Sequence, residues 1–318
     1  MRPRDLPSIT PSQNVSSRAK KLAAKWLRRD WPRQTNHLAR SNKVAIAVVS
    51  YNTAPLVSLL LFSLFRVLGR DQIARIVVVD NASTDDSPQM LKAFQEQGLL
   101  DVIFNKKQQY HGPALNQAIK HLADVNRKIG ESQDGFDHVW ILDSDVIVLR
   151  RDAFAHAAKF LEEQQAAVVG EFQYDALSEG YAHISSLLID PEKVWRRSVT
   201  PFEHSGAPAR SLQISLRRHS LKICDFPFRS QNYILHLGRG TLKVIAENNE
   251  RDNPYYDWAM QHSTPHYHGN PNGALIFEEF LKRFHLEVPS RSPQQLIKAC
   301  LDPAPLDFDI SRFNAPIA

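Results

Sequence analysis

The sequence predicts an α/β fold whose central sheet is mostly parallel and covered by helices on both faces. Continuously apolar runs of strand length alternate with helical segments between residues 44 and 150, which is the pattern of parallel strand–helix–strand units. The runs lack alternating polar positions, so both of their faces should be buried. Polar residues follow each run, and in such a sheet they would gather at its carboxyl edge, where ligands bind.

Composition and helix-end signals place the elements of the first half. Pro55 opens the first helix and Gly69 closes it, because proline suits the first helical turn and glycine the residue after the last. Ser87 should cap the second helix, with Pro88 in its first position and Gly98 after its end. The expected strands are 44–49, 76–79, 102–104 and 139–142, and the expected helices are 55–68, 88–97 and 114–125.

The second half has weaker patterns. Residues 152–165 read as an amphipathic helix in which Phe154, Ala157 and Leu161 share one face. The other expected elements are strands over 166–172, 182–189 and 233–237 and helices over 208–219 and 273–284. The proline-rich tail after Asp302 should wrap around the domain or fray.

One short motif carries chemistry. Asp143 and Asp145 flank Ser144 and lie between two apolar runs, 139–142 and 146–149. A desolvated carboxylate is costly unless it is paired or bound to a cation. Hard divalent cations such as Mg²⁺ and Mn²⁺ prefer carboxylate oxygens, so the motif indicates a metal site. The alternative for an isolated Asp-x-Asp is a pair of turn-capping residues.

Two classes of nucleotide-binding protein do not fit. The turn after the first strand is Ser50-Tyr51-Asn52-Thr53-Ala54-Pro55, which contains no glycine. A dinucleotide-binding enzyme would need Gly-x-Gly-x-x-Gly there, so that the backbone approaches the pyrophosphate. A Walker-type phosphate loop is also absent. The phosphates must be held in another way, for which paired aspartates with a metal are suited.

The positive charge of the sequence is concentrated at its start. Residues 1–42 contain ten Lys or Arg and two Asp, a net +8, which leaves −3 for the remainder of a chain of net charge +5. We therefore expect no nucleic-acid partner. Residues 1–17 look disordered. A short basic amphipathic helix should follow, and residues 18–33 would either lie on an anionic membrane surface or dock on the domain itself.

The location expected from composition is cytoplasmic, with peripheral attachment to the inner face of the membrane as an option. Cys224 and Cys300 are too few for a disulfide scaffold. The longest apolar stretch, residues 56–68, is interrupted by Ser58, Ser63 and Arg66 and is shorter than a membrane span of ~20 residues. The first residues lack the apolar core of a signal peptide.

Four segments together resemble family 2 glycosyltransferases of the GT-A fold. In chain order they are Val48-Val49-Ser50-Tyr51-Asn52, Val77-Val78-Val79-Asp80-Asn81-Ala82-Ser83-Thr84-Asp85, Gly112-Pro113-Ala114-Leu115-Asn116-Gln117-Ala118 and Leu142-Asp143-Ser144-Asp145. The resemblance implies a Rossmann-like nucleotide-diphospho-sugar transferase domain over residues 43–318. Residues 43–150 would be its nucleotide-sugar-binding half, and residues 151–318 its acceptor half and C-terminal tail.

The resemblance also implies an activity, the inverting transfer of a sugar from a nucleotide-diphosphate donor to a hydroxyl acceptor. We expect a UDP- or dTDP-linked sugar and a role in polysaccharide, cell-wall or glycoconjugate synthesis. Mn²⁺ or Mg²⁺ would be held by Asp143, Asp145 and His236, the last because a late histidine after a strand often completes the metal site of this fold. A buried histidine bonded to backbone is the alternative for His236.

The donor would be held by residues at the strand ends and in the third motif. These expected nucleotide-sugar-binding residues are Ser50, Tyr51, Asn52, Asp80, Asn81, Asn105, Gly112, Asn116, Asp143 and Ser144. Pro113, Leu115 and Gln117 depart from the Gly/Arg-richer loop that is usual in the family, which puts the diphosphate or ribose contacts of that loop in doubt.

The acceptor half should supply the general base. The family usually places an acidic residue before a helix in this half, and Glu203 stands in the matching region, with Asp175 and Asp225 as further candidates. His266 and His268 could pair on a metal or lie in a loop. Three alternatives remain for the whole chain: a catalytically inactive nucleotide-sugar-binding module, a sugar-nucleotide nucleotidyltransferase, and a peripheral membrane scaffold that would use the basic arm alone. The second normally has a Gly-rich basic loop near its first strand, which is missing here.

Overall fold

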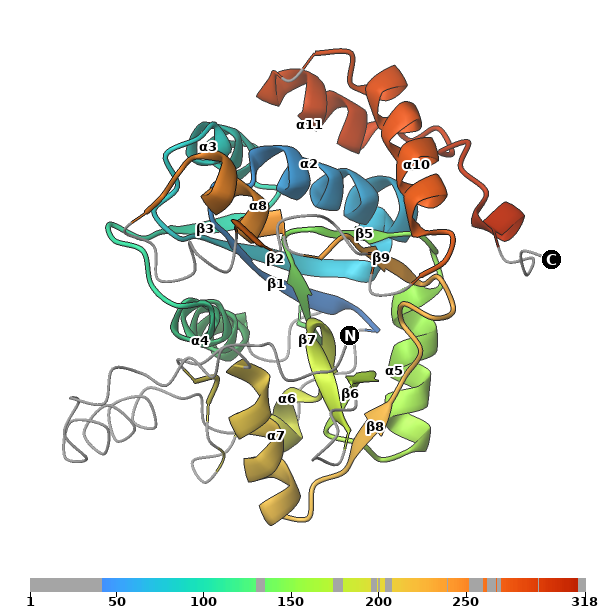
Figure 1. Cartoon of the computed structure of the whole chain (residues 1–318). Coiled ribbons are helices and arrows are strands. Elements are labelled where there is room, and N and C mark those ends of the chain that lie inside the picture. The colour runs from blue at the N-terminus through green and yellow to red at the C-terminus, as the bar shows by residue number, and fades with distance from the viewer. Residues whose placement is uncertain are drawn as a thin grey trace.

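The computed structural model has a seven-stranded sheet at its centre (Figure 1). The strands lie in the order β3 (Asp101–Phe104), β2 (Ile73–Asp80), β1 (Val44–Ser50), β4 (His138–Asp143), β7 (Tyr181–Ile189), β6 (Val168–Gln173) and β8 (Ile223–Asp225). A second, two-stranded sheet joins β5 (Val146–Val148) and β9 (Ile234–His236). The structure describes residues 42–129, 135–173, 180–195, 199, 201–203, 208–238, 240–251, 260–261, 267, 270–290 and 292–313, and for Thr241, Leu242 and Val244 the backbone only.

The first four strands of the sheet are parallel to one another, as the sequence predicts. β1 pairs with β2 on one side and with β4 on the other, and β2 pairs with β3. β7 then runs antiparallel to both of its neighbours, β4 and β6. The prediction of a mostly parallel sheet is therefore confirmed, with one reversed strand at the join between the two halves of the chain.

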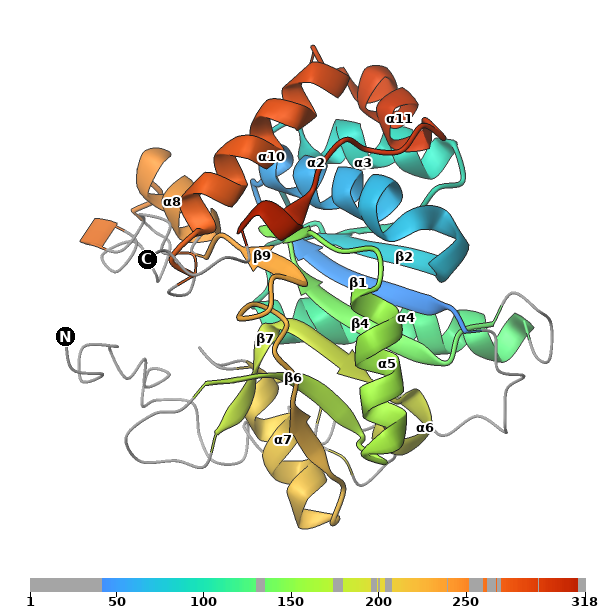
Figure 2. The same cartoon turned by 90° about the vertical axis from the view of Figure 1, so that its right-hand side faces the viewer.

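Helices cover both faces of the sheet, in two separate apolar clusters (Figures 1 and 2). Side chains alternate along a strand, so Ile46 and Val48 belong to one cluster while Ala45 and Ala47 belong to the other. On the first face lie α2 (Ala54–Ser63), α3 (Ser87–Glu96), α5 (Ala153–Glu163), α10 (Gly273–Glu287) and α11 (Pro293–Leu301). On the second face lie α4 (His111–Ile129), α6 (Pro191–Val194) and α7 (Pro208–Arg218).

Helix ends differ from the expectations in two places. The first helix does not stop as an α-helix but continues as π-helix η2 (Leu64–Gly69) and 3-10 helix η3 (Arg70–Gln72), with Gly69 at φ +97°. Ser87 is the first residue of α3 and not its cap, because Asp86 occupies the cap position. The Ser87 N–H is accepted by Asp85 Oδ1 at 3.0 Å, and the Asp86 side chain forms no cap hydrogen bond within the described residues.

Three of the α-helices that the structure describes in the second half were not expected, and the first of them is the short α6 after β7. α8 (Gly240–Glu247) follows β9, and α11 packs on α2 and α3. Ser292 caps α11 by accepting the Gln295 N–H, with Pro293 at the start of the helix, signals that the sequence displays. The sequence left open whether the tail after Asp302 wraps or frays, and its described part, which ends in 3-10 helix η5 (Ile310–Phe313), wraps. Its side chains contact the first cluster through Leu306, Phe308, Ile310 and Phe313.

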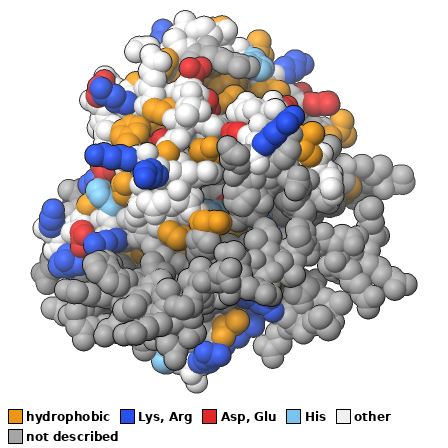
Figure 3. Space-filling view, turned by 60° about the vertical axis from the view of Figure 1, so that its left-hand side comes forward, with side chains coloured by type: hydrophobic (Ala, Val, Ile, Leu, Met, Phe, Trp, Pro, Cys, Tyr) orange, Lys and Arg blue, Asp and Glu red, His pale blue; other side chains and the backbone are white. Residues whose placement is uncertain are grey.

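The predicted basic N-terminal helix lies outside the described residues. Within the part that the structure describes, no helix combines the length and the apolar character needed to cross a bilayer. Among the described side chains on the face shown in Figure 3, Lys and Arg are interspersed with acidic and apolar residues and do not form one continuous positive surface.

The C-terminal helices should be part of the folding unit. Phe280 of α10 is fully buried, and its ring meets Phe62 of α2 at 6.1 Å and Phe308 at 5.2 Å between centroids. Phe280→Ala should lower the free energy of unfolding by about 3–5 kcal/mol, since it removes a buried aromatic ring and leaves a cavity. Leu275→Ala on the same helix, where the side chain is 54% exposed, should change it by less than about 0.5 kcal/mol. Urea titration of both variants tests this, and equal small effects would show that α10 is not part of the core.

Candidate active site

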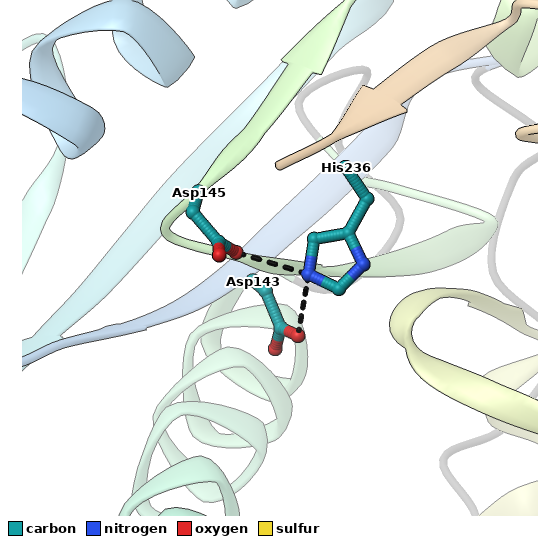
Figure 4. A group of neighbouring side chains, drawn as sticks. All are labelled: Asp143, Asp145 and His236. Atoms are coloured by element: carbon teal, nitrogen blue, oxygen red, sulfur yellow. Dashed lines mark ion pairs between the residues drawn. The ribbon is translucent and has the colours of Figure 1, made fainter. Parts of the chain in front are cut away.

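The candidate metal group forms where β4 passes into β5. Asp143 is the last residue of β4, and Asp145 directly precedes β5. β9 pairs antiparallel with β5, with His236 opposite Val146, and the Leu237 N–H is accepted by the Asp145 carbonyl at 3.1 Å. Strand pairing therefore brings His236 beside two aspartates more than 90 residues earlier in the sequence (Figure 4).

The three side chains converge on one small volume. His236 Nε2 lies 3.1 Å from Asp145 Oδ1 and 3.6 Å from Asp143 Oδ2. One oxygen or nitrogen of each residue lies within 4.8 Å of the others, so the group can hold a metal ion. Asp143 Oδ1 is buried and accepts no hydrogen bond from the described residues. Two carboxylates and an imidazole suit a divalent cation such as Mn²⁺, and a bound cation would also compensate the buried oxygen that lacks a hydrogen bond.

Asp145 is held in place from a second side by α8. Its Oδ2 accepts the backbone N–H of Gly240, the first residue of that helix, at 3.0 Å. A Cβ at position 240 would lie 2.5 Å from Leu56 Cδ1 and 3.0 Å from the Asp145 carboxylate, so a larger residue there would require both side chains to move. The positive end of the helix dipole favours the ionised form of Asp145.

Without a cation, the three groups shift one another's pKa values. Burial raises the pKa of Asp143, and the nearby Asp145 adds to this rise against the opposing effects of His111 and His236. Burial would also raise the pKa of Asp145, but the charge of His236 and the hydrogen bonds from His236 and Gly240 outweigh it and lower that pKa. Burial acts to lower the pKa of His236, and the two aspartates overcome it and raise that pKa. A proton on His236 therefore compensates the buried carboxylates.

Two further histidines surround the group, and sequence reasoning missed both. His111 starts α4, and its Nε2 lies 3.7 Å from Asp143 Oδ1. The ring of His183 on β7 lies 5.6 Å from that of His236, centroid to centroid, and its Nδ1 is 2.8 Å from Ser185 Oγ. Burial and the nearby His236 and Arg229 keep the pKa of His183 well below its ordinary value. The position of His111 directly before the Gly112 motif was the one local signal.

Ser50, Asp80 and Ser144 meet at the same edge of the sheet. Ser50 stands opposite Asp80 in the β1–β2 register. Thr53 Oγ1 links Ser50 Oγ, 3.0 Å away, to Ser144 Oγ, 3.2 Å away. Asp80 is 2% exposed, its Oδ1 accepts the Ser83 N–H at 3.1 Å, and its Oδ2 has no hydrogen bond within the described residues. Burial raises the pKa of Asp80, and a ligand N–H that donates to Oδ2 would offset the cost of burying this carboxylate.

Tyr51 and Asn52 extend this edge toward the surface. Asn52 has φ +50°, its backbone N–H donates to Ser83 Oγ at 3.0 Å, and its Oδ1 accepts the Thr84 N–H at 2.7 Å. Tyr51 Oη and Asn52 Nδ2 both donate to Glu250, at 3.2 and 3.3 Å. The turn after β1 is therefore tied to the turn after β2 and to a residue of the second half.

The other residues that were expected to bind the nucleotide sugar form hydrogen bonds between loops. Asn81 Oδ1 accepts the Gln109 N–H at 2.9 Å and Asn105 Nδ2 at 3.1 Å. Asn116 binds the backbone of Phe202, donating to its carbonyl at 2.7 Å and accepting its N–H at 3.1 Å. A Cβ at Gly112 would overlap the Glu203 carbonyl. These contacts place residues 201–203 against the start of α4, beside the metal group.

The three base candidates have different surroundings. Glu203 lies against Gly112, next to His111, and its Oε2 accepts Ser211 Oγ–H at 2.6 Å. Asp225 ends β8, three strands away from β4, where it is exposed and its Oδ1 accepts the Phe172 N–H at 2.8 Å. The backbone of Glu203 therefore packs on the start of α4 while its carboxylate is bonded to Ser211 of α7, and Asp225 lies apart from both. Asp175, His266 and His268 lie outside the described residues.

Comparison with protein families matches residues 45–221 to the model of glycosyl transferase family 2. This match covers more than half of the chain, and the chain belongs to that family. The family, the fold class and the enzyme class expected from the sequence are thereby confirmed. Comparison with curated proteins found no significant match.

Several solved structures are similar at low identity. The mannosyltransferase PcManGT of Pyrobaculum calidifontis, in complex with GDP-Man and Mn²⁺, is 19% identical with a TM-score of 0.44, covering 88% of this chain and 93% of that one. S. aureus TarS 1–349 with UDP-GlcNAc is 20% identical with a TM-score of 0.33, covering 46% and 44%. Glucosyl-3-phosphoglycerate synthase of Mycobacterium tuberculosis, with phosphoglyceric acid, is 16% identical with a TM-score of 0.41, covering 66% and 80%. The family assignment rests on the family model and not on these structures.

Cation binding should be coupled to proton release. The two aspartates raise the pKa of His236 above its usual value. Because a ligating imidazole must be neutral, a cation competes with a proton for this residue. Affinity for Mn²⁺ should therefore fall as the pH is lowered from about 8 to about 6. Calorimetry in buffers of different ionisation enthalpy should show release of protons by the wild type and weaker binding with less release by His236→Ala. Binding of Mn²⁺ without any proton release in this range would contradict the pKa shifts described above.

Proposed function

We propose that this chain transfers a sugar, with inversion, from a nucleotide-diphosphate donor to a hydroxyl acceptor, and that Asp143, Asp145 and His236 hold the Mn²⁺ or Mg²⁺ it requires. The observation that carries this proposal is the convergence of these three side chains at the end of β4, beside the ends of β1 and β2. The polar residues there, Ser50 to Asn52 and Asp80, suit a nucleoside. The donor would be a UDP- or dTDP-linked sugar, and the acceptor would belong to polysaccharide, cell-wall or glycoconjugate synthesis.

The residues divide the work between binding and proton transfer. A cation at this group would stabilise the negative charge that develops on the leaving diphosphate. Asp80, Tyr51 and Asn52 would orient the nucleoside, while the hydrogen bond from Gly240 fixes Asp145. Glu203 would take the proton of the acceptor hydroxyl as it attacks, and Ser211 holds its carboxylate by a 2.6 Å hydrogen bond.

Titration calorimetry with UDP, and separately with dTDP, with and without Mn²⁺, tests the donor site. The proposal predicts nucleotide binding that strengthens when Mn²⁺ is present, followed by slow Mn²⁺-dependent hydrolysis of the matching nucleotide sugar. Binding without hydrolysis or transfer would identify an inactive nucleotide-sugar-binding module. Release of pyrophosphate from a nucleoside triphosphate and a sugar phosphate would identify a nucleotidyltransferase.

Asp145 and Asp80 should have separable roles. Asp145→Asn should abolish Mn²⁺-dependent turnover and remove the gain in UDP affinity that Mn²⁺ provides, because an amide replaces a charged ligand. Metal-free binding of uridine should be unaffected. Asp80→Asn should weaken metal-free binding of uridine and leave the gain in UDP affinity from Mn²⁺ unchanged. Asp71→Asn is a suitable control, since its side chain is 64% exposed and pairs with Arg151 at the surface. If both site variants lose the same part of the binding, the proposed division is wrong.

Glu203 should affect turnover and not donor binding. Glu203→Gln keeps the size and an acceptor for Ser211 but removes the proton acceptor, and loss of a positioned base costs about 10²–10⁴-fold in rate. Affinity for UDP and the melting temperature should stay at wild-type values. Near-normal turnover would exclude Glu203 as the base and leave Asp175 as the acidic candidate of the acceptor half to examine next.

A further inference from the structure

Glu250 contacts the nucleoside segment from the second half of the chain. Oε2 of this carboxylate accepts Tyr51 Oη–H at 3.2 Å, and Oε1 accepts Asn52 Nδ2 at 3.3 Å. Almost 200 residues separate these partners in the sequence. Sequence reasoning assigned Tyr51 and Asn52 to the nucleotide but gave Glu250 no role.

Helix α8 connects this contact with the metal group. Its first residue, Gly240, donates its N–H to Asp145 Oδ2. Glu250 follows the other end of the helix, where Asn249 has φ +54° and the Glu250 N–H is accepted by the Ile245 carbonyl at 3.2 Å. Eight helical residues span about 12 Å. Figures 1 and 2 show α8 at the edge of the sheet where β1 ends. One helix thus reaches from the cation ligands to the nucleoside residues.

Glu250 and Asp80 are joined through a series of hydrogen bonds. Asn52 donates its side-chain N–H to Glu250 and its backbone N–H to Ser83 Oγ, and Ser83 donates its own N–H to Asp80 Oδ1. Two carboxylates therefore border the segment, one buried and one partly exposed. Ionised carboxylates only accept hydrogen bonds. The nucleoside groups that can donate to them are base N–H groups and the ribose hydroxyls.

The two carboxylates differ in position. Asp80 ends β2, deep in the sheet edge, and is the acceptor suited to the base. Glu250 follows the end of α8 that is remote from Asp145 and contacts Tyr51 and Asn52 in the turn after β1. In a nucleotide the ribose lies between the base and the diphosphate. Burial and the neighbouring Glu250 raise the pKa of Tyr51 to about 12, so its hydroxyl stays protonated and keeps the Glu250 carboxylate in place.

From this arrangement we infer that Glu250 accepts a hydrogen bond from the 2′-hydroxyl of the donor's ribose and so selects ribonucleotide donors. The inference rests on the proposed function and narrows it. It favours UDP- or GDP-linked sugars over dTDP-linked ones, because a 2′-deoxyribose leaves the carboxylate without this donor.

Calorimetry with UDP and dUDP, and with GDP and dGDP, each with Mn²⁺, tests the inference on three proteins. These are the wild type, Glu250→Gln and the control Glu247→Gln, whose side chain is 63% exposed on α8 and pairs with Lys243 at 3.7 Å. The wild type and the control should bind the ribonucleotide about tenfold more tightly than its 2′-deoxy counterpart, the effect of one hydrogen bond to a charged group. Glu250→Gln should lose most of this preference by weakening ribonucleotide binding alone, with an unchanged melting temperature.

Each other outcome overturns the inference. An unchanged preference in Glu250→Gln would show that another residue reads the ribose. An equal loss for both nucleotides would assign Glu250 to the base or to the shape of the turn, and tighter binding of both would make it an obstacle that the donor displaces. These results leave the proposed function standing, whereas a wild type that binds none of the four nucleotides would remove the function together with the inference.

Discussion

Two carboxylates and an imidazole lie together in the buried end of this sheet because β5 pairs with β9. The Asp-x-Asp turn alone would leave two negative charges in a poorly solvated place, which is costly. The imidazole of His236 compensates them, and its raised pKa is the consequence. The same three groups can serve as ligands of a divalent cation. The pairing that compensates the buried charges without metal therefore also forms the metal-binding group.

Two helices, α8 and α4, begin beside this centre. α8 directs its first N–H to Asp145, and α4 starts with His111 beside Asp143. Glycine stands at or next to each of these helix starts. A Cβ at position 112 would overlap the Glu203 backbone, and one at position 240 would press on the side chains of Leu56 and Asp145. The contact at Gly112 also carries residues 201–203, so the proposed base Glu203 is positioned by the same helix start. The cation ligand Asp145 and the backbone of the base candidate Glu203 are therefore each placed against the start of a helix.

The first half of the fold was predictable because its signals are local. Continuous apolar runs, helix-end prolines and glycines, and polar strand ends identified the parallel strands and the edge where Asp80 and Asp143 meet. The second half depends on pairing between distant segments, such as β5 with β9 or Tyr51 with Glu250, and no local pattern encodes such pairing. For the same reason α8 and the histidines His111 and His183 were missed. Asn81 and Asn116 show a further limit, since the sequence could not tell an amide that binds a ligand from one that binds backbone.

The central claim is that Asp143, Asp145 and His236 form one cation site for a nucleotide diphosphate. Anomalous diffraction from crystals grown with Mn²⁺ and UDP measures this most directly. The account predicts a manganese peak within ligand distance of Asp145 and His236 and in contact with the diphosphate oxygens. A diphosphate bound at this edge with the manganese peak elsewhere, or with none, would contradict it.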